Sequence, residues 1–202
     1  MEINCLLCGV GGQGTVLASK LIAYAAMKRG LNVRTAETIG MAQRGGCVVS
    51  HVRVGETIYS PLIPKKGADI IIAFEPAEAV RCLDYLKENG TVIVNNKAVK
   101  PVTASLSGNA YDGSEMLSYL EKQVKNLRVI DGDAVCEKCG SAKVLNMVLL
   151  AAGAGLDSLG ISVEELKNAV RERIPEKFQA LNLKTIEIAV REVSGRKETT
   201  QL

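Results

Sequence analysis

The sequence predicts an α/β fold with three layers (αβα): a mainly parallel sheet, an inserted β-hairpin and a helical C-terminal segment. Over the first 133 residues, short apolar runs alternate with helical segments, as in parallel βαβ units. From residue 141 onward the apolar residues recur with helical spacing. We therefore expect one domain over residues 1–202, in which an α/β core (1–133) carries a helical part (134–202) packed on it.

The first βαβ unit is predicted within residues 3–36. An apolar run at 3–8 is typical of a buried strand, and a second strand is predicted at 31–36. The helix between them, 15–29, is apolar on most sides and is therefore expected to be buried. It ends before Gly30, a residue type that commonly follows the last helical turn.

The next segment interrupts this pattern. Residues 37–46 are rich in glycine and polar side chains, and they precede two short runs, 47–54 and 57–60, that flank the turn Gly55-Glu56. Strand, two-residue turn and strand predict a β-hairpin. Within the run 47–54, His51 shares with Arg53 a face that we expect to be half exposed.

The remaining elements follow the α/β pattern and then become helical. Strands are predicted at 70–74, 91–95 and 127–130. Helices are predicted at 76–88, 113–125, 141–154, 162–173 and 178–193. Ser162, followed by Glu165, predicts a capping box at the start of its helix.

Composition excludes several classes of protein. The apolar stretches are far shorter than the roughly 20 residues that cross a bilayer, and the first residues do not resemble a secretory signal. A cytoplasmic location is the expectation. A net charge of +3 with 3% aromatic residues offers neither a basic stripe nor a stacking surface for nucleic acid.

The six cysteines include two C-x-x-C pairs. Cys5 and Cys8 lie in a predicted strand, where residues three apart point to opposite faces and could not chelate one metal ion. Cys136 and Cys139 precede Gly140 and suit either a metal or redox turn or an ordinary turn between helices. No second clustered pair completes a tetrahedral set, so we assign no metal site.

A glycine loop is the strongest local signal. The pattern Gly9-x-Gly11-x-x-Gly14 follows a strand and precedes a helix, and Glu37 follows the second strand. This combination is typical of a Rossmann-like dinucleotide site, although such glycines can also serve only a close turn between strand and helix. The extra Gly12, the hairpin and the cationic segment 43–46 disfavour the dinucleotide interpretation.

Candidate site residues follow from the glycine loop and from the segment 43–46. Unpaired amides at a helix N-terminus favour an anion, and an arginine adds positive charge. The candidate binding residues are Gly9, Gly11, Gly12, Gln13, Gly14, Gln43, Arg44, Gly45 and Gly46. The catalytic residues are not identified; Arg44 and His51 are the candidates, and His51 suits a structural or interface role as well as proton transfer.

Four segments together resemble a known family. They are GVGGQG (9–14), ETIGMAQRGG (37–46), VSHVR (49–53) and YSPLIP (59–64). The chain resembles the gamma subunits of 2-oxoacid:ferredoxin oxidoreductases, above all the small (beta) subunits of the indolepyruvate type. The likeness extends over nearly the whole chain, through Asn146 and KFQALN (177–182), but does not include Cys136 and Cys139.

The resemblance implies an enzyme complex that oxidatively decarboxylates an aryl 2-oxoacid to an acyl-CoA and passes electrons to ferredoxin. Thiamine diphosphate, Mg and iron-sulfur clusters are then expected on the large (alpha) subunit, and this sequence has no C-x-x-C-x-x-C run. The chain would be inactive alone, would help to close the substrate cavity, and would contact CoA phosphates through residues 11–14 and Arg44.

Other functions remain open at this point. One is a free-standing NAD(P)- or FAD-binding oxidoreductase, and another is a non-enzymatic interaction module that docks through residues 47–60. In isolation the chain could pair as a homodimer through an interface that its partner would otherwise cover. The sequence does not select one 2-oxoacid.

Overall fold

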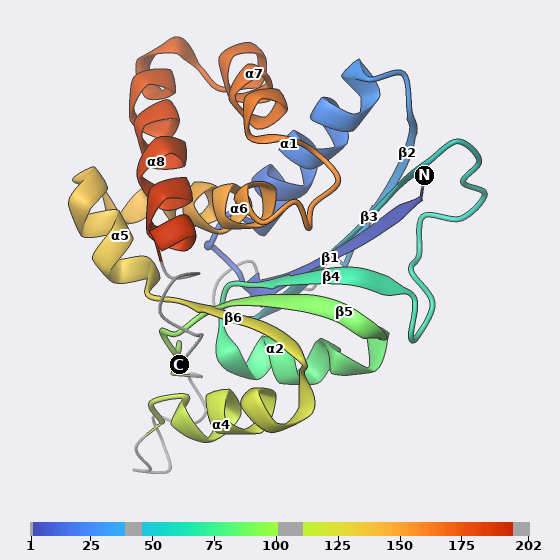
Figure 1. The fold of residues 1–202 in the computed structure, drawn as a ribbon, viewed down its shortest axis with the longest axis vertical. Coiled ribbons are helices and arrows are strands. Elements are labelled where there is room, and N and C mark those ends of the chain that lie inside the picture. The colour runs from blue at the N-terminus through green and yellow to red at the C-terminus, as the bar shows by residue number, and fades with distance from the viewer. Residues whose placement is uncertain (1, 39–45, 101–110, 196–202) are drawn as a thin grey trace.

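The computed structural model describes residues 2–38, 46–100 and 111–195. In this part of the chain a sheet of six strands forms the middle layer, and helices cover both of its faces (Figure 1). The strand order is β2-β3-β1-β4-β5-β6. The strands are β1 (Ile3–Val10), β2 (Asn32–Glu37), β3 (Cys47–Gly55), β4 (Ala68–Ala73), β5 (Leu86–Asn95) and β6 (Asn126–Ile130).

The sheet is mainly parallel, as predicted. Strands β1, β4, β5 and β6 pair in parallel, whereas β3 is antiparallel to both of its neighbours, β1 and β2. The predicted hairpin is therefore wrong in its second arm, because residues 57–60 are not a strand. Both edges of β3 are already paired, so no edge remains for another strand. The antiparallel pair in this part of the chain is formed by β2 and β3, and not by β3 and residues 57–60.

Helices from both ends of the chain cover one face of the sheet. They are α1 (Thr15–Lys28), α5 (Gly132–Cys139), α6 (Leu145–Gly155), α7 (Val163–Arg173) and α8 (Glu176–Gly195). The other face carries α2 (Pro76–Cys82) and α4 (Ser114–Gln123), and two short 3₁₀ turns, η1 (Leu83–Tyr85) and η2 (Ala142–Val144), complete the regular structure described. Figure 1 shows the larger helical layer above the sheet and the smaller one below it.

The predicted helix 76–88 is too long. It stops at Cys82 and passes through η1 into β5, which begins at Leu86 rather than at residue 91. Leu86 is buried and pairs with Ala68 before the register becomes irregular, and regular pairing begins where Thr91 meets Ile70. Leu86 buries its apolar side chain by joining the sheet. The free energy gained by this burial is larger than that of continuing the helix.

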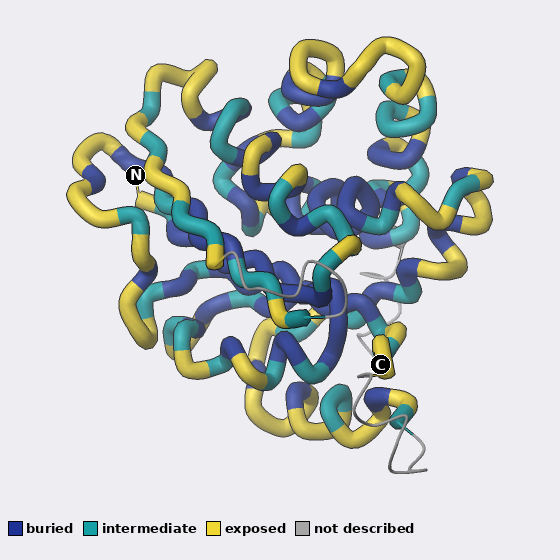
Figure 2. Tube along the Cα trace, turned by 180° about the vertical axis from the view of Figure 1, so that it is seen from behind, coloured by how far each residue is buried: buried dark blue, intermediate teal, exposed yellow. Residues whose placement is uncertain are grey.

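Each face of the sheet has its own apolar core. The larger core lies under α1, α5, α6, α7 and α8, and the smaller one lies under α2 and α4. Cys5 belongs to the first and Cys8 to the second, which confirms that their side chains point to opposite faces. Figure 2 shows the buried residues along the central strands and on the inner sides of the helices.

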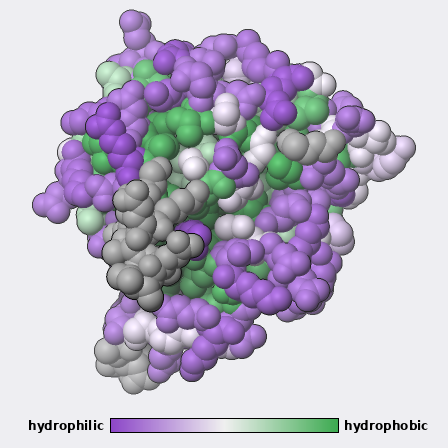
Figure 3. Space-filling view, viewed as in Figure 1, coloured by the Kyte–Doolittle hydropathy of each residue, from purple (hydrophilic) through white to green (hydrophobic). Residues whose placement is uncertain are grey.

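The surface shows no membrane-spanning element. Figure 3 shows hydrophilic side chains over most of one side of the molecule, with hydrophobic ones mainly in the middle, where helices and sheet meet. Within the described ranges, no helix has the length and apolar character to cross a bilayer.

The C-terminal helices correct one expectation and confirm another. Cys136 and Cys139 are not in a turn between helices: both lie in the last turns of α5 and are buried, and Gly140 with a φ of 80° ends that helix. At the start of α7, the hydroxyl of Ser162 accepts from the Glu165 amide while the Glu165 carboxylate accepts from the Ser162 amide. The capping box is therefore present.

Candidate functional site

Gly11 of the glycine loop lies beside Gly46, the residue that precedes β3. The amide of Gly11 donates to the carbonyl oxygen of Gly46 at 2.9 Å. This contact arises because β3 begins at Cys47 and pairs with the last residue of β1, Val10. The structure thus brings Gly46 to the glycine loop, although the two are separated by about thirty residues in the sequence. Gln43, Arg44 and Gly45 lie outside the described residues.

The loop backbone requires glycine at two positions. Gly12 has a φ of 103° and Gly14 a φ of 85°, conformations that other residue types adopt only with strain. Gly14 is also the N-cap of α1, which has no side-chain cap and no acidic residue in its first turn. No described residue accepts a hydrogen bond from the amide of Gly12 or Gly14. These amides and the helix dipole favour an anion at this point.

Gln13 has a structural partner at each end of its carboxamide. Its Oε1 accepts from the Val10 amide at 2.7 Å, and its Nε2 donates to the Phe74 carbonyl at 3.1 Å. The side chain therefore joins the end of β1 to the end of β4. Gly9 leaves the space for it, since a Cβ at Gly9 would lie 2.7 Å from Gln13 Oε1. The Gln13 side chain therefore fixes the loop conformation, and the loop can offer a ligand its backbone amides.

Glu37 is not placed as a ribose-binding acid would be. In the dinucleotide-binding order the second strand lies next to the first, but here β3 separates β2 from β1. Glu37 is thus two strand spacings, about 10 Å, from the strand that leads into the loop. Its carboxylate accepts a hydrogen bond from the Ser19 hydroxyl at 3.1 Å. The sheet order removes the main support for the dinucleotide alternative.

His51 is buried, although its face of β3 was expected to be half exposed. Its Nδ1 accepts from the Ile63 amide at 3.2 Å, and its ring packs edge-on against Tyr85 with centroids 5.7 Å apart. Burial lowers the pKa of His51, because the charged form loses hydration. His51 pairs with Leu6, so it lies about 13 Å along the strand from the glycine loop. The contacts are those of a structural residue.

Three buried polar residues beside the loop were missed at the sequence level. Glu75 caps α2 by accepting from the Glu78 amide at 3.0 Å, and its other oxygen accepts from the Tyr111 hydroxyl at 2.7 Å. Asn95 accepts from the Gly132 amide at 3.1 Å. Asn146 packs on Gly14. The available signal was a polar residue directly after an apolar strand, which applies to Glu75 and Asn95 but not to Asn146.

Cysteines from separate elements gather below the sheet, next to Glu78. The neighbouring Cys82 thiol and then burial raise the pKa of Cys8, while burial and then a hydrogen bond with Glu78 raise the pKa of Cys47 to about 12. One carboxylate oxygen of Glu78 is buried without a partner. No set of three or more His, Cys, Asp or Glu side chains within the described residues has metal-binding geometry.

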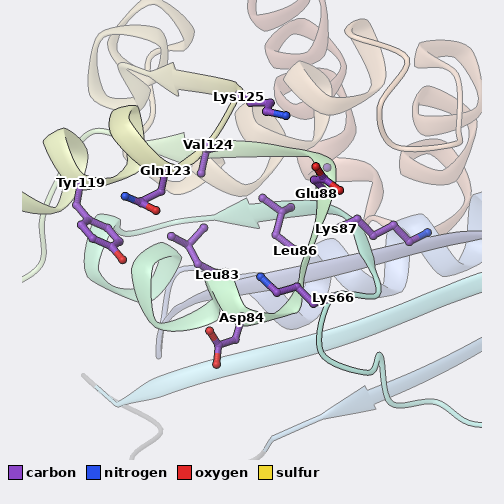
Figure 4. A pocket seen from close by; sticks show the side chains of 11 residues that line it. Lys66, Leu83, Asp84, Leu86, Lys87, Glu88, Tyr119, Gln123, Val124 and Lys125 are labelled. Atoms are coloured by element: carbon purple, nitrogen blue, oxygen red, sulfur yellow. The ribbon is translucent and has the colours of Figure 1, made fainter.

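A groove of about 380 Å³ lies at the end of the sheet opposite to the glycine loop. It lies between α4 and the start of β5 and is lined by polar residues such as Lys66, Asp84 and Gln123 around Leu83 and Leu86 (Figure 4). In open α/β sheets, ligands bind outside the carboxyl ends of the strands, at the point where the strand order reverses. Here that point lies between β1 and β4, at the glycine loop, whereas the groove lies at the amino ends. We therefore take the glycine loop as the candidate site.

Comparison with known proteins decides the family. The model of the family described as pyruvate ferredoxin/flavodoxin oxidoreductase matches residues 4–192, nearly the whole chain, which includes the sequence segments 9–14 and 37–46. The chain belongs to the pyruvate ferredoxin/flavodoxin oxidoreductase family. The resemblance inferred from the glycine loop and the segment after β2 is thereby confirmed.

Curated relatives place the chain more closely within this family. Indolepyruvate oxidoreductase subunit IorB of Archaeoglobus fulgidus is 40% identical over 198 residues, which cover 97% of this chain and 98% of that protein. The subunit of the same name from Methanothermobacter thermautotrophicus is 37% identical and covers 91% of this chain and 94% of that protein. Nearly the whole of this chain thus matches nearly the whole of each of these relatives.

Two solved structures share the fold of this chain. The gamma subunit of a keto/oxoacid ferredoxin oxidoreductase from Geobacter sulfurreducens is 22% identical, with a TM-score of 0.69 over 96% of this chain and 99% of that one. A 2-oxoglutarate:ferredoxin oxidoreductase from Magnetococcus marinus, with coenzyme A bound, is 20% identical with a TM-score of 0.73. The match covers 96% of this chain but 31% of that one.

Proposed function

We propose that the chain is the small subunit of an indolepyruvate-type 2-oxoacid:ferredoxin oxidoreductase. The complex oxidatively decarboxylates an aryl 2-oxoacid to an acyl-CoA and passes the electrons to ferredoxin. The main support is the 40% identity to an indolepyruvate oxidoreductase subunit over almost the full length of both proteins. Thiamine diphosphate, Mg and the iron-sulfur clusters belong to the large subunit, which is the proposed partner.

The glycine loop is the proposed contact with CoA. The amides of Gly12 and Gly14, which have no acceptor among the described residues, lie at the start of α1 and suit a phosphate group. In the sequence Arg44 lies just before Gly46, and it would add a cation to this site. A related 2-oxoglutarate:ferredoxin oxidoreductase has coenzyme A bound, which supports CoA as the ligand. In this role the chain positions CoA, while decarboxylation and electron transfer occur on the partner.

An exposed loop offers a surface for the large subunit. The side chain of Tyr59 is 93% exposed and that of Leu62 is 56% exposed. The backbone beneath them is held in place, because the Arg53 guanidinium donates to the carbonyls of Ser60 and Leu62 at 3.1 and 3.4 Å. An aromatic anchor on an ordered loop loses little entropy on binding, so it suits a docking contact. We assign this loop, residues 59–62, to the interface with the large subunit.

Reconstitution tests the proposed function. Mixed with a thiamine-dependent large subunit, the chain should restore reduction of an artificial electron acceptor that depends on both indolepyruvate and CoA. Arg44→Ala should raise KM for CoA about tenfold, the loss expected for a charged hydrogen bond to phosphate. Arg34→Ala, which removes an exposed arginine from β2, serves as the matched control. A large subunit that is fully active without this chain would contradict the proposal.

A further inference from the structure

Three cysteines and one glutamate from three elements meet between the sheet and α2. In the register of β1 with β3, Cys8 and Cys47 are diagonal neighbours on the same face of the sheet. Glu78 and Cys82 are one helical turn apart on α2, and both are buried. Because α2 covers the face of the sheet that carries Cys8, the four side chains form one cluster (Figure 1).

The thiols of Cys8 and Cys82 are in direct contact. Cys8 is fully buried and Cys82 is 4% exposed, and a hydrogen bond joins their sulfur atoms. This hydrogen bond lowers the pKa of Cys82, because the Cys8 thiol donates to the Cys82 sulfur and stabilises its thiolate. The thiolate is the nucleophilic form of cysteine, so Cys82 is the more reactive member of the pair. Cys8 is then the neighbouring thiol that can resolve an oxidised Cys82.

The other two members of the cluster give it a path to solvent and an acceptor for protons. Cys47 is exposed and forms a hydrogen bond with Glu78, so the cluster reaches the surface at the start of β3. The pKa of Cys47 is raised to about 12, which keeps it a thiol and makes it less reactive than Cys82. The Glu78 carboxylate is buried, and its Oε2 has no hydrogen-bond partner. A buried unpaired oxygen costs free energy, which a proton from a thiol would offset.

We propose that Cys8 and Cys82 are a redox-active thiol pair, which a small peroxide oxidises to a reversible disulfide between β1 and the last residue of α2. In the first step the Cys82 sulfur attacks hydrogen peroxide, the O–O bond breaks, and Cys82 becomes a sulfenic acid while one water leaves. In the second step the Cys8 sulfur attacks the Cys82 sulfur, the S–O bond breaks, and a second water leaves. The thiols lose two electrons, the peroxide gains them, and the two thiol protons end in the water molecules. The disulfide would anchor β1 to α2 directly before Gly9, where the glycine loop begins.

Mass spectrometry of the full chain after brief treatment with hydrogen peroxide tests the proposal, with the remaining thiols alkylated before digestion. The wild type should lose two hydrogen atoms in mass, yield a linked peptide that contains Cys8 and Cys82, and recover both thiols in dithiothreitol. Cys8→Ala should lose the linkage and instead accumulate a sulfenic acid at Cys82, which dimedone traps. The peptide map of the wild type needs no variant, so the linkage is tested even where a variant does not fold.

Cys136→Ala is the matched control, since Cys136 is also 4% exposed but lies in α5, on the other face of the sheet. It should form the linkage between Cys8 and Cys82 as the wild type does. A disulfide that joins Cys47 or Cys139 in place of this pair would overturn the proposal. So would a wild type in which Cys8 and Cys82 stay reduced while Cys47 is oxidised. These outcomes are measured on the chain alone, so failed reconstitution would overturn the proposed function without affecting the redox pair.

Discussion

Gln13 shows how one side chain can make a glycine loop rigid. It is polar and stands among glycines in a candidate binding loop, so its residue type suggests a ligand contact. In the structure its two carboxamide atoms instead pair with the Val10 amide and the Phe74 carbonyl. Val10 is the last residue of β1, and Phe74 directly follows the last residue of β4. The residue therefore fixes the distance between β1 and β4 at the candidate site.

Substitution of Gln13 should destabilise the fold. Gln13→Ala leaves the Val10 amide unpaired and the Phe74 carbonyl with only the longer hydrogen bond from Asn95 Nδ2 at 3.4 Å, and a part-buried polar group left unpaired costs about 1 to 3 kcal/mol. We expect the free energy of unfolding, measured by urea denaturation, to fall by about 2 to 3 kcal/mol. Gln123→Ala, at the exposed end of α4, should change it by less than about 0.5 kcal/mol. Equal effects of the two substitutions would contradict the structural role.

His51 should make stability depend on pH. Because burial lowers its pKa in the folded state, the unfolded chain binds the proton first as the pH falls. The folded state should therefore lose stability as the pH drops below about 6.5, the ordinary histidine value. His51 is the only histidine in the sequence, so a single substitution removes the whole effect.

Urea midpoints at pH 7.5 and 5.5 measure this pH dependence. The wild type should lose more stability between the two values than His51→Gln, whose carboxamide oxygen can still accept from the Ile63 amide but cannot be protonated in this range. A larger loss in the variant than in the wild type would show that His51 is more easily protonated when folded.

At the scale of elements, β3 decides what surrounds the glycine loop. It is the only described strand that runs against the others, and it lies between β1 and β2. Its start places Gly46 beside Gly11, and its later part supports the exposed loop through His51 and Arg53. One strand thus connects the candidate anion site with the proposed docking loop, which lie at different ends of it.

The docking loop should affect assembly and not folding. Tyr59→Ser removes an aromatic side chain that is 93% exposed, so the melting temperature of the isolated chain should stay within about 2 °C. Binding to the large subunit, measured by calorimetry or surface plasmon resonance, should weaken at least tenfold if Tyr59 is an anchor. Tyr119→Ser, at a 47% exposed tyrosine on α4, serves as the control. Unchanged affinity in Tyr59→Ser would place the interface elsewhere.

At the scale of the whole molecule, strand order separates this fold from a dinucleotide-binding one. The loop, the following helix and an acid after the second strand are all present, so the local sequence matches the dinucleotide pattern. The antiparallel β3 moves β2 one position outward, and Glu37 forms its hydrogen bond with Ser19 instead. The local motif is therefore present without the strand order that would bring Glu37 to a ribose at the loop.

Titration of the purified chain with NAD and with FAD should therefore give binding at least about tenfold weaker than that of a micromolar dinucleotide site. A dinucleotide site without its ribose acid lacks a charged hydrogen bond, which alone contributes roughly tenfold in affinity. Micromolar binding of NAD that is lost in Glu37→Ala would contradict the sheet-based interpretation and revive the dinucleotide alternative.

The sequence alone determined the elements whose signals are local. Hydrophobic periodicity and glycine positions predicted α1 and most other helices and strands, and the Ser162–Glu165 spacing predicted the start of α7. The paired motifs at residues 9–14 and 37–46 also predicted the family, because a close backbone turn restricts residue types strongly.

Only the tertiary structure decided the properties that depend on contacts between distant residues. The pairing of β3 with β1 and β2, the burial of His51, and the contact of Asn146 with Gly14 join segments that local periodicity treats separately. A residue type states which hydrogen bonds a side chain can form, but not which partners the fold brings to it. For that reason the sequence listed Gln13 as a candidate binding residue, whereas the structure shows its side chain bonded to Val10 and Phe74.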